Sequence, residues 1–95
     1  MTKEDVEELK GEKIEVDVLD ERTDGNRLCY ILYNVELGKF VISLCDCTSN
    51  PWEILDPKNH LYGSVSMELS DGIIHYIPAV LNIYDVNSRK GYIQF

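Results

Sequence analysis

The sequence predicts an α+β domain that is mostly β, with six to seven antiparallel strands in a small barrel or curled sheet and one short N-terminal helix. Three observations support this class. Apolar and polar residues alternate with a period of two in several stretches, turn residues separate those stretches, and the clearest helix signals lie in the first eleven residues. With 95 residues, the chain has the size of one domain. We therefore expect a single domain over 1–95, with a helix at 2–11 and a β meander at 13–95.

The helix prediction depends on its two ends. Thr2 can cap the N-terminus, and Asp5 follows three residues later, as in a capping box. Gly11 is a typical stop signal. Only Val6 and Leu9 are apolar, so the buried face is narrow and the helix depends on packing for its stability.

The next predicted element is a half-buried strand. Ile14, Val16 and Val18 share one face, and charged residues occupy the positions between them. A turn is expected at 20–26, where Asp24 and Gly25 stand together.

A β-hairpin over 27–46 forms the predicted centre of the domain, with two apolar runs around residues 36–39. Gly38 can end a three-residue loop, although a four-residue loop with a shifted register is an alternative. The three-residue loop places Val35 opposite Lys39, Leu32 opposite Ile42, and Cys29 opposite Cys45. Both faces of the first strand are apolar, which predicts cover on both sides.

The segment 47–60 contains two prolines and is expected to be irregular, with a short edge strand or a helical turn at 52–55. Residues 61–69 alternate, and Asp71 and Gly72 predict a two-residue hairpin turn. In that register Glu68 lies opposite His75. Four residues then share the core face: Met67, Leu69, Ile74 and Tyr76.

The last part of the chain is predicted to form two more strands. Pro78 should bend or end the preceding strand. Residues 79–86 suit either a helix, since proline is common at a first helical position, or a strand, since their β-branched and aromatic residues favour it; we predict the strand. A turn at 87–91 and a short strand at 92–95 complete the chain.

Charge is unevenly distributed along the chain. The net charge is −8, and residues 1–24 hold ten acids and four bases, a net charge of −6. Such a surface repels a phosphate backbone, so direct nucleic-acid binding is not expected, whereas a basic protein partner is. The acidic N-terminus does not resemble a signal peptide, and no apolar run approaches the ~20 residues of a membrane span. We expect a cytoplasmic protein that does not bind membranes.

Cysteine and histidine suggest a metal site, which the spacing does not support. Cys45, Cys47 and His60 carry soft ligand atoms, and the predicted register places Cys29 across from Cys45. Structural zinc sites normally show four ligands in recognisable pairs. The cysteines are better explained as small core residues, and we predict no metal and no cofactor.

Catalytic patterns are equally weak. No local motif joins a cysteine to His60 or His75 as a nucleophile and base. A Glu68–His75 pair is more simply a surface contact. The acidic stretch 20–25 resembles a calcium loop only superficially, because Arg22 and Ile31 stand where oxygen ligands are required. We therefore expect a protein that is not an enzyme.

The acidic N-terminal quarter is the candidate binding surface. Glu15 and Asp17 lie on one strand face, where carboxylates repeat at about 6.6–6.8 Å, similar to consecutive phosphates of a nucleic-acid strand. Exposed aromatic residues can anchor an interface. The predicted partner-binding residues are Glu4, Glu8, Glu15, Asp17, Asp20, Glu21, Asp24, Trp52 and Tyr62.

These features favour an acidic binding protein that occupies a basic, nucleic-acid-binding surface of a partner protein. An inhibitor from a phage or mobile element, or an immunity protein against a nuclease toxin, has this profile. A solubilising charged face is the alternative reading of the acids. The alternative function is a structural subunit that oligomerises through its apolar β surface, with a homodimer as one form. Salt dependence distinguishes the two, because exposed charges are screened and apolar contacts are not.

Overall fold

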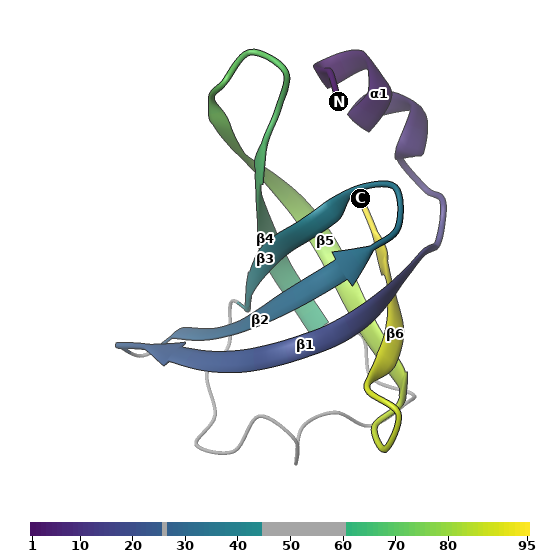
Figure 1. The fold of residues 1–95 in the computed structure, drawn as a ribbon, viewed down its shortest axis with the longest axis vertical. Coiled ribbons are helices and arrows are strands. Elements are labelled where there is room, and N and C mark those ends of the chain that lie inside the picture. The colour runs from purple at the N-terminus through teal and green to yellow at the C-terminus, as the bar shows by residue number, and fades with distance from the viewer. Residues whose placement is uncertain (26, 45–60) are drawn as a thin grey trace.

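The computed structural model describes residues 1–25, 27–44 and 61–95. In this part of the chain, six antiparallel strands form a closed barrel in sequence order, and the last strand pairs with the first (Figure 1). The elements are α1 (Lys3–Leu9), β1 (Ile14–Asp24), β2 (Arg27–Asn34), β3 (Gly38–Leu44), β4 (Leu61–Glu68), β5 (Ile74–Asp85) and β6 (Lys90–Gln94). The predicted mostly β class with one N-terminal helix is confirmed.

The helix α1 begins where the capping signals place it. Thr2 accepts a hydrogen bond from the Asp5 amide at 3.2 Å, and the Asp5 carboxylate accepts one from the Thr2 amide at 2.9 Å. This capping box satisfies two backbone donors at the helix start. Gly11 has a φ of +83° after the last turn, a conformation that glycine adopts without strain. The helix is shorter than the predicted range 2–11, and Val6 is its buried residue.

Side chains from all six strands fill the barrel interior, and Val6 of α1 joins the same core cluster. Small closed barrels are packed with side chains because their interior is narrow. In β2, β3 and β4 every second residue is buried, as period-two strands require. The predicted inward face of β1 is confirmed, with Val16 and Val18 buried and Ile14 packed against the core. The largest fully buried side chains are Tyr30, Leu28, Leu32, Ile42, Leu81, Ile83, Ile93 and Val65.

The strand β1 continues through most of the predicted turn at 20–26, so that prediction was wrong over residues 20–24. Pairing with β2 runs from Asp17 opposite Tyr33 to Asp24 opposite Arg27, with an irregularity between Val18 and Asp20. Leu19 is the extra residue of this bulge. A β-bulge inserts one residue and moves the following side chains to the opposite face. Residues 20–24 are held by backbone pairing with β2, so they form a strand without alternating apolar residues.

The central hairpin forms, but its predicted register was wrong by two residues. Asn34 lies opposite Gly38, and Leu32 lies opposite Phe40. The Asn34 side chain accepts hydrogen bonds from the amides of residues 36 and 37 at 2.8 and 3.0 Å. This Asx turn starts the loop at Asn34, and Gly38, with a φ of +75°, follows it as the first residue of β3. Cys29 therefore pairs with Ser43, and Cys45 lies outside the described residues.

The β4–β5 hairpin also has a longer loop than predicted. The Leu69 amide donates to the Ile73 carbonyl at 3.2 Å, and the Gly72 amide donates to the Leu69 carbonyl at 3.0 Å. Residues 70–72 thus form a three-residue loop, with Gly72 at a φ of +75°. Glu68 consequently pairs with Ile74, and Met67 pairs with His75.

This register corrects two predictions. Glu68 and His75 are not opposite one another. Met67 and Leu69 are buried as expected, but Ile74 and Tyr76 are exposed on the outer face, at 55% and 71%. One extra loop residue exchanges the two faces of the following strand, because side chains alternate with a period of two.

Pro78 lies inside β5 and does not end it. It pairs with Ser64 of β4, and β6 pairs with β5 only from Val80 onward. The Leu69–Ile73 hydrogen bond fixes the alternation of backbone groups in this hairpin. Odd-numbered residues of β5 direct their amide and carbonyl groups toward β4, so the backbone nitrogen of Pro78, which carries no hydrogen, lies on the side away from β4. Proline is tolerated there because no ladder bond is lost. The predicted strand at 79–86 is confirmed to Asp85.

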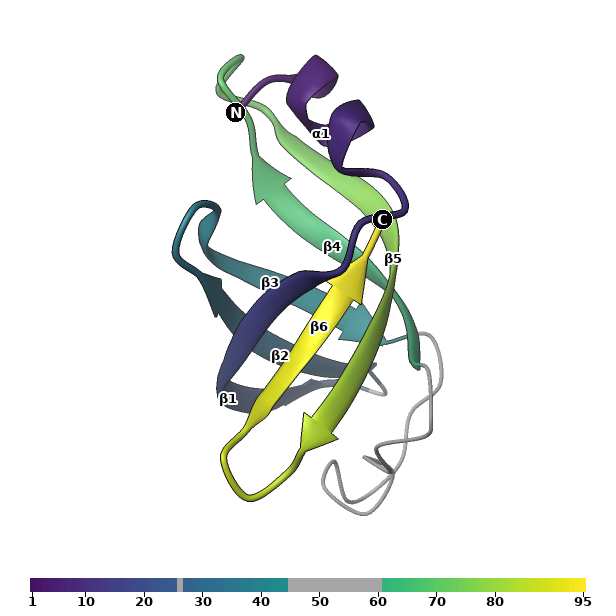
Figure 2. The ribbon, with the colours of Figure 1, turned by 90° about the vertical axis from the view of Figure 1, so that its right-hand side faces the viewer.

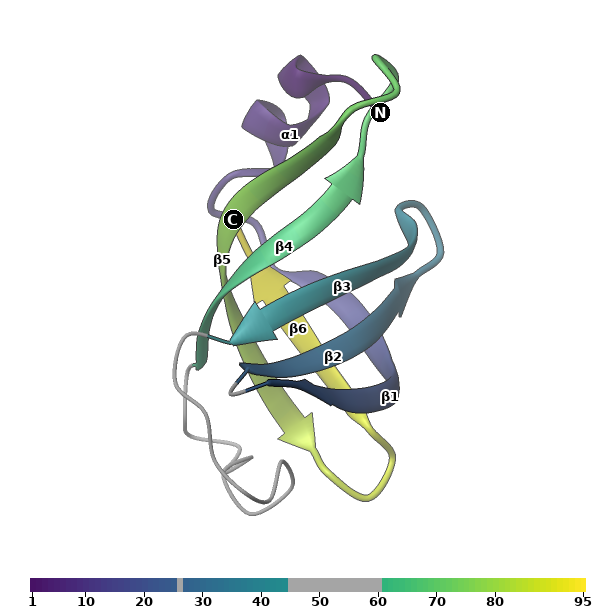
Figure 3. The ribbon, with the colours of Figure 1, turned by 90° about the vertical axis from the view of Figure 1, so that its left-hand side faces the viewer.

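The predicted cover of both β2 faces is only partly found. Leu28, Tyr30 and Leu32 point inward and are fully buried, whereas Ile31 on the outer face is half-buried and Tyr33 is 38% exposed. Figures 2 and 3 show α1 above one end of the barrel, beside the β4–β5 hairpin. The predictions for 47–60, including Trp52, Cys47 and His60, fall outside the described residues.

Candidate functional site

Most of the predicted partner-binding acids lie at the surface, along α1 and β1. Glu4 and Glu8 are exposed on α1, and Glu15 and Asp20 are exposed on β1. Asp17 is half-exposed. Asp24 stands opposite Arg27 in the β1–β2 ladder. We call the set Glu4, Glu8, Glu15, Asp17 and Asp20 the acidic surface.

Glu15 and Asp17 share the outer face of β1, as predicted, but neighbouring strands supply partners for both. The Tyr84 hydroxyl donates to Glu15 Oε2 at 2.7 Å, and this hydrogen bond raises the pKa of Tyr84. Lys90 Nζ lies 3.3 Å from Asp17 Oδ1. This face therefore does not present two unpartnered carboxylates with the spacing of phosphates. Its negative charge is partly balanced by β6.

Glu21 follows the bulge and faces a different direction from Glu15 and Asp17. It stands opposite Tyr30, whose side chain is fully buried, and directly opposed residues share a sheet face. Arg89 Nη1 lies 3.8 Å from Glu21 Oε2. Burial, followed by the negative charge of Glu21, raises the pKa of Tyr30 far above its ordinary value. The structure thus turns Glu21 toward the barrel interior, away from the acidic surface.

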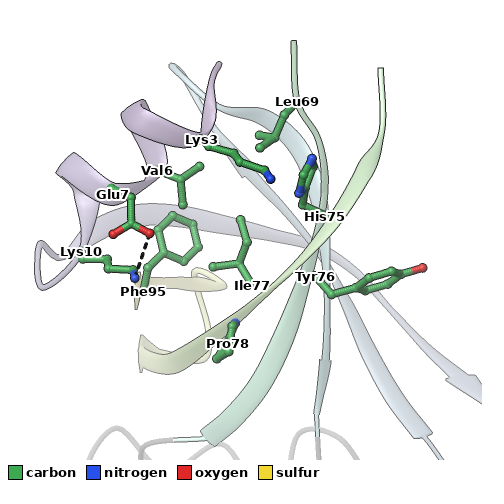
Figure 4. Close-up of a pocket in the computed structure, with 10 residues that line it drawn as sticks. All are labelled: Lys3, Val6, Glu7, Lys10, Leu69, His75, Tyr76, Ile77, Pro78 and Phe95. Carbon is green, nitrogen blue, oxygen red and sulfur yellow. Dashed lines mark ion pairs between the residues drawn. The ribbon is translucent and has the colours of Figure 1, made fainter. Parts of the chain in front are cut away.

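A groove between α1 and β5 is a hollow that sequence reasoning missed. It has a volume of about 410 Å³. Its apolar floor comes from three separate parts of the chain, with Val6 on α1, Ile77 on β5 and Phe95 after β6 (Figure 4). Leu69 lies at the hairpin end, and Lys3, Glu7 and Lys10 of α1 form the charged wall. The narrow apolar face of the helix was the available signal in the sequence.

Both ends of α1 are attached to the barrel. At the first end, the Ser70 amide and hydroxyl each donate to the Met1 carbonyl at 2.8 Å. At the second end, the Gly11 amide donates to the Phe95 carbonyl at 3.2 Å, and the Gln94 side chain donates to the Gly11 carbonyl at 3.1 Å. The helix therefore bridges the β4–β5 hairpin tip and the end of β6, with the groove beside it.

His75 contacts the loop of its own hairpin. Its Nε2 lies 2.8 Å from Asp71 Oδ2. Figure 4 shows the Lys3 ammonium pointing toward the His75 ring across the groove. The Ile73 amide also donates to Asp71, at 2.9 Å, and these contacts lower the pKa of Asp71, with the Ile73 amide as the largest cause. His75, Asp71 and Lys3 thus form a polar cluster at one end of the apolar floor.

Exposed aromatic residues occupy the outer face of the β4–β5 pair. Tyr62, a predicted anchor, is 70% exposed, and Tyr76 is 71% exposed. Ser66 lies opposite Tyr76, and Tyr62 lies opposite Val80, so both tyrosines project from the outside of the barrel. Such residues supply contact area with little loss of side-chain entropy on binding.

The described ranges contain no cluster of three or more metal-ligating side chains. Cys29 Sγ lies 3.3 Å from Ser43 Oγ, and the other cysteines and His60 are outside those ranges. No helix in the described part is both long and apolar enough to cross a membrane. No protein-family model matches the chain, and neither the curated proteins nor the solved structures include a significant match to it.

Proposed function

We propose that this protein is a non-enzymatic binding protein that occupies a basic surface of a partner protein. One observation carries the proposal. Of the ten acids in residues 1–24, none with a described side chain is classed as buried, and Glu4, Glu8, Glu12 and Asp20 are exposed, so their charge is within reach of a partner. Clustered charge of one sign attracts an oppositely charged protein and accelerates its association.

The proposed partner belongs to the nucleic-acid-handling proteins, whose binding surfaces are basic. The protein would act as an inhibitor or an immunity-type protein of phage or mobile-element origin, in the cytoplasm. The total negative charge supports this proposal, and the phosphate-like spacing of Glu15 and Asp17 does not, because Tyr84 and Lys90 engage those two carboxylates.

The test compares two double variants of equal net charge. Glu8→Gln with Asp20→Asn removes two carboxylates of the acidic surface. Glu36→Gln with Glu68→Gln removes two exposed carboxylates elsewhere. Tagged forms of both and of the parent protein capture partners from the native host, and quantitative mass spectrometry measures recovery at about 0.1 M and about 1 M salt, where the Debye length falls from about 10 Å to about 3 Å.

The proposal expects basic proteins on the parent, recovered poorly at high salt and more weakly by the Glu8, Asp20 variant than by its control. Equal recovery by the two variants would overturn it. So would partners that are not basic or that resist high salt.

A second function, that of an oligomerising subunit, is favoured by the exposed outer face of β4 and β5. Tyr62, Ile74 and Tyr76 are each more than half exposed there. Isolated surface apolar residues are normal, but grouped ones mark interaction sites. Light scattering at both salt concentrations distinguishes this function, since an apolar interface persists at high salt. A monomer under both conditions would remove it.

A further inference from the structure

In the described part of the chain, β5 has an unpaired sheet edge over residues 74–79. β4 pairs with Ile74–Leu81, while β6 pairs with β5 only from Val80 onward. Within the described ranges, no strand occupies the other side of residues 74–79. The backbone groups of Ile74 and Tyr76, and the carbonyl of Pro78, face this side, because alternate residues of an antiparallel strand direct their hydrogen-bonding groups to opposite sides. Edges of this kind are templates for another strand.

The groove lies along this edge. Tyr76, Ile77 and Pro78 line it from β5, and Phe95 marks the point where β6 ends (Figure 4). A strand placed here would continue the line of β6 and run antiparallel to β5. Its alternate side chains would point onto the apolar floor formed by Val6, Ile77 and Phe95, and the others would point outward beside Tyr76.

The charges around the groove favour a basic occupant. Glu7 lines the groove itself, and Glu4 and Asp71 line an adjoining hollow of about 300 Å³ at the hairpin end. The charges within the two linings nearly balance, because Lys10 pairs with Glu7 at 3.0 Å, His75 contacts Asp71 at 2.8 Å, and Lys3 stands against Glu4. The acidic excess comes from the rest of α1, where Asp5 and Glu8 are also exposed.

We infer that the edge of β5 at Ile74–Pro78 binds an extended segment of the partner protein, in which basic residues alternate with large apolar ones. This inference rests on the proposed function and specifies how the partner is held. Main-chain hydrogen bonds to Ile74 and Tyr76 would supply affinity, and the apolar floor would select every second side chain. The acidic rim would favour basic residues on the outward face.

The test uses a short capped synthetic peptide in which lysine or arginine alternates with valine. Residues opposite Ile74 and Tyr76 share their outward face, so the basic residues of the peptide direct their amides toward β5. N-methylation of the internal basic residues should abolish binding. N-methylation of the valines, whose amides face away from β5, should leave it intact. A peptide with glutamate in place of the basic residues should bind more weakly.

Protein variants provide the second arm. Tyr76→Pro removes the central edge amide at a position whose amide makes no bond to β4, and Tyr76→Phe keeps that amide. Binding measured by fluorescence anisotropy should weaken roughly fivefold or more in Tyr76→Pro, the effect of one lost hydrogen bond, and should be retained in Tyr76→Phe. Hydrogen exchange at the Ile74 and Tyr76 amides should slow when the peptide binds.

Three results with the peptide would overturn the inference. They are equal binding of the two methylated peptides, equal binding of the glutamate peptide, and unchanged exchange at Ile74 and Tyr76. The peptide arm does not depend on the folding of the proline variant. Dimerisation of the protein alone, lost in Tyr76→Pro, would identify a second copy as the occupant and also reject the inference. A Tyr76→Pro protein that still captures basic partners with full salt sensitivity would retain the proposed function and remove only the edge.

Discussion

The imidazole of His75 binds the carboxylate of Asp71 within one hairpin, with 2.8 Å between Nε2 and Oδ2. The contact exists because the loop has three residues, which places Asp71 above the strand that carries His75. Glu68, across the sheet, pairs with Ile74 instead. A single loop residue therefore decided which carboxylate His75 contacts.

We expect His75→Ala to raise the pKa of Asp71, since one hydrogen bond to its carboxylate is lost. The pKa should remain below the ordinary value of 3.8, because the Ile73 amide is the larger cause of the lowering. A lowered folded-state pKa stabilises the protein above the unfolded-state pKa. That contribution to stability disappears as the pH falls from about 4 through the folded-state pKa. The variant should therefore lose less stability than the parent over this pH range. NMR titration of the Asp71 carboxyl carbon measures the change. Asp85, held by Ser88, is the internal control, and an unchanged Asp71 value would contradict the prediction.

Thr2→Ala should weaken α1, because the side chain that accepts the Asp5 amide is removed. N-cap substitutions of this kind cost about 0.5–2 kcal/mol of helix stability. The pKa of Asp5 should rise but stay below 3.8, because the largest cause of its lowering is the hydrogen bond from the Thr2 backbone amide, which alanine retains. Thr2→Ser keeps the hydroxyl and should behave as the parent. Hydrogen exchange at Val6 measures the helix. Equal exchange rates in the alanine and serine variants would refute the role of the cap.

Leu81→Ala should lower the free energy of unfolding by about 2–5 kcal/mol, the range for a truncated core leucine. Leu81 is fully buried between β4 and β6 partners. Tyr62→Ala on the outer face is the control and should change stability by no more than about 0.5 kcal/mol. Urea denaturation measures both. Similar losses in the two variants would show that Leu81 is not central to the core.

Gly91→Ala should destabilise the barrel where β6 meets β5. A Cβ atom at Gly91 would collide with the Asn82 carbonyl oxygen and would lie 2.9 Å from Cδ1 of Ile83. Backbone cannot move away as a flexible side chain does, so we expect a loss of about 1–3 kcal/mol, as in overpacked cores. Ser66→Ala, on the outside of β4, is the matched control. A Gly91→Ala protein with the melting temperature of the parent would disprove the close approach.

The predicted elements came from local signals that the structure confirms. The capping box at Thr2 and the apolar alternation at Val16 and Val18 depend only on neighbouring residues. The choice of strand for 79–86 likewise followed from β-branched and aromatic side chains. The charge of the N-terminal quarter was also readable directly, since acidic residues lie at the surface unless they are paired.

The candidate groove could not be predicted, because its floor joins residues that are far apart in the sequence. Val6, Ile77 and Phe95 meet only when the barrel closes and α1 is attached at Ser70 and Phe95. The edge of β5 depends equally on the length of β6, which ends before reaching Pro78. No local pattern carries that information.

By itself the sequence determined the mostly β class, the N-terminal helix and the placement of negative charge, since propensity, periodicity and capping act over a few residues. Tertiary structure decided the registers, the inward turn of Glu21 after the Leu19 bulge, and the open edge at Ile74–Pro78. The physical reason is the period of two in a β-strand. One extra residue in a loop or bulge exchanges the faces of everything that follows, and its cost is set by packing across the whole barrel.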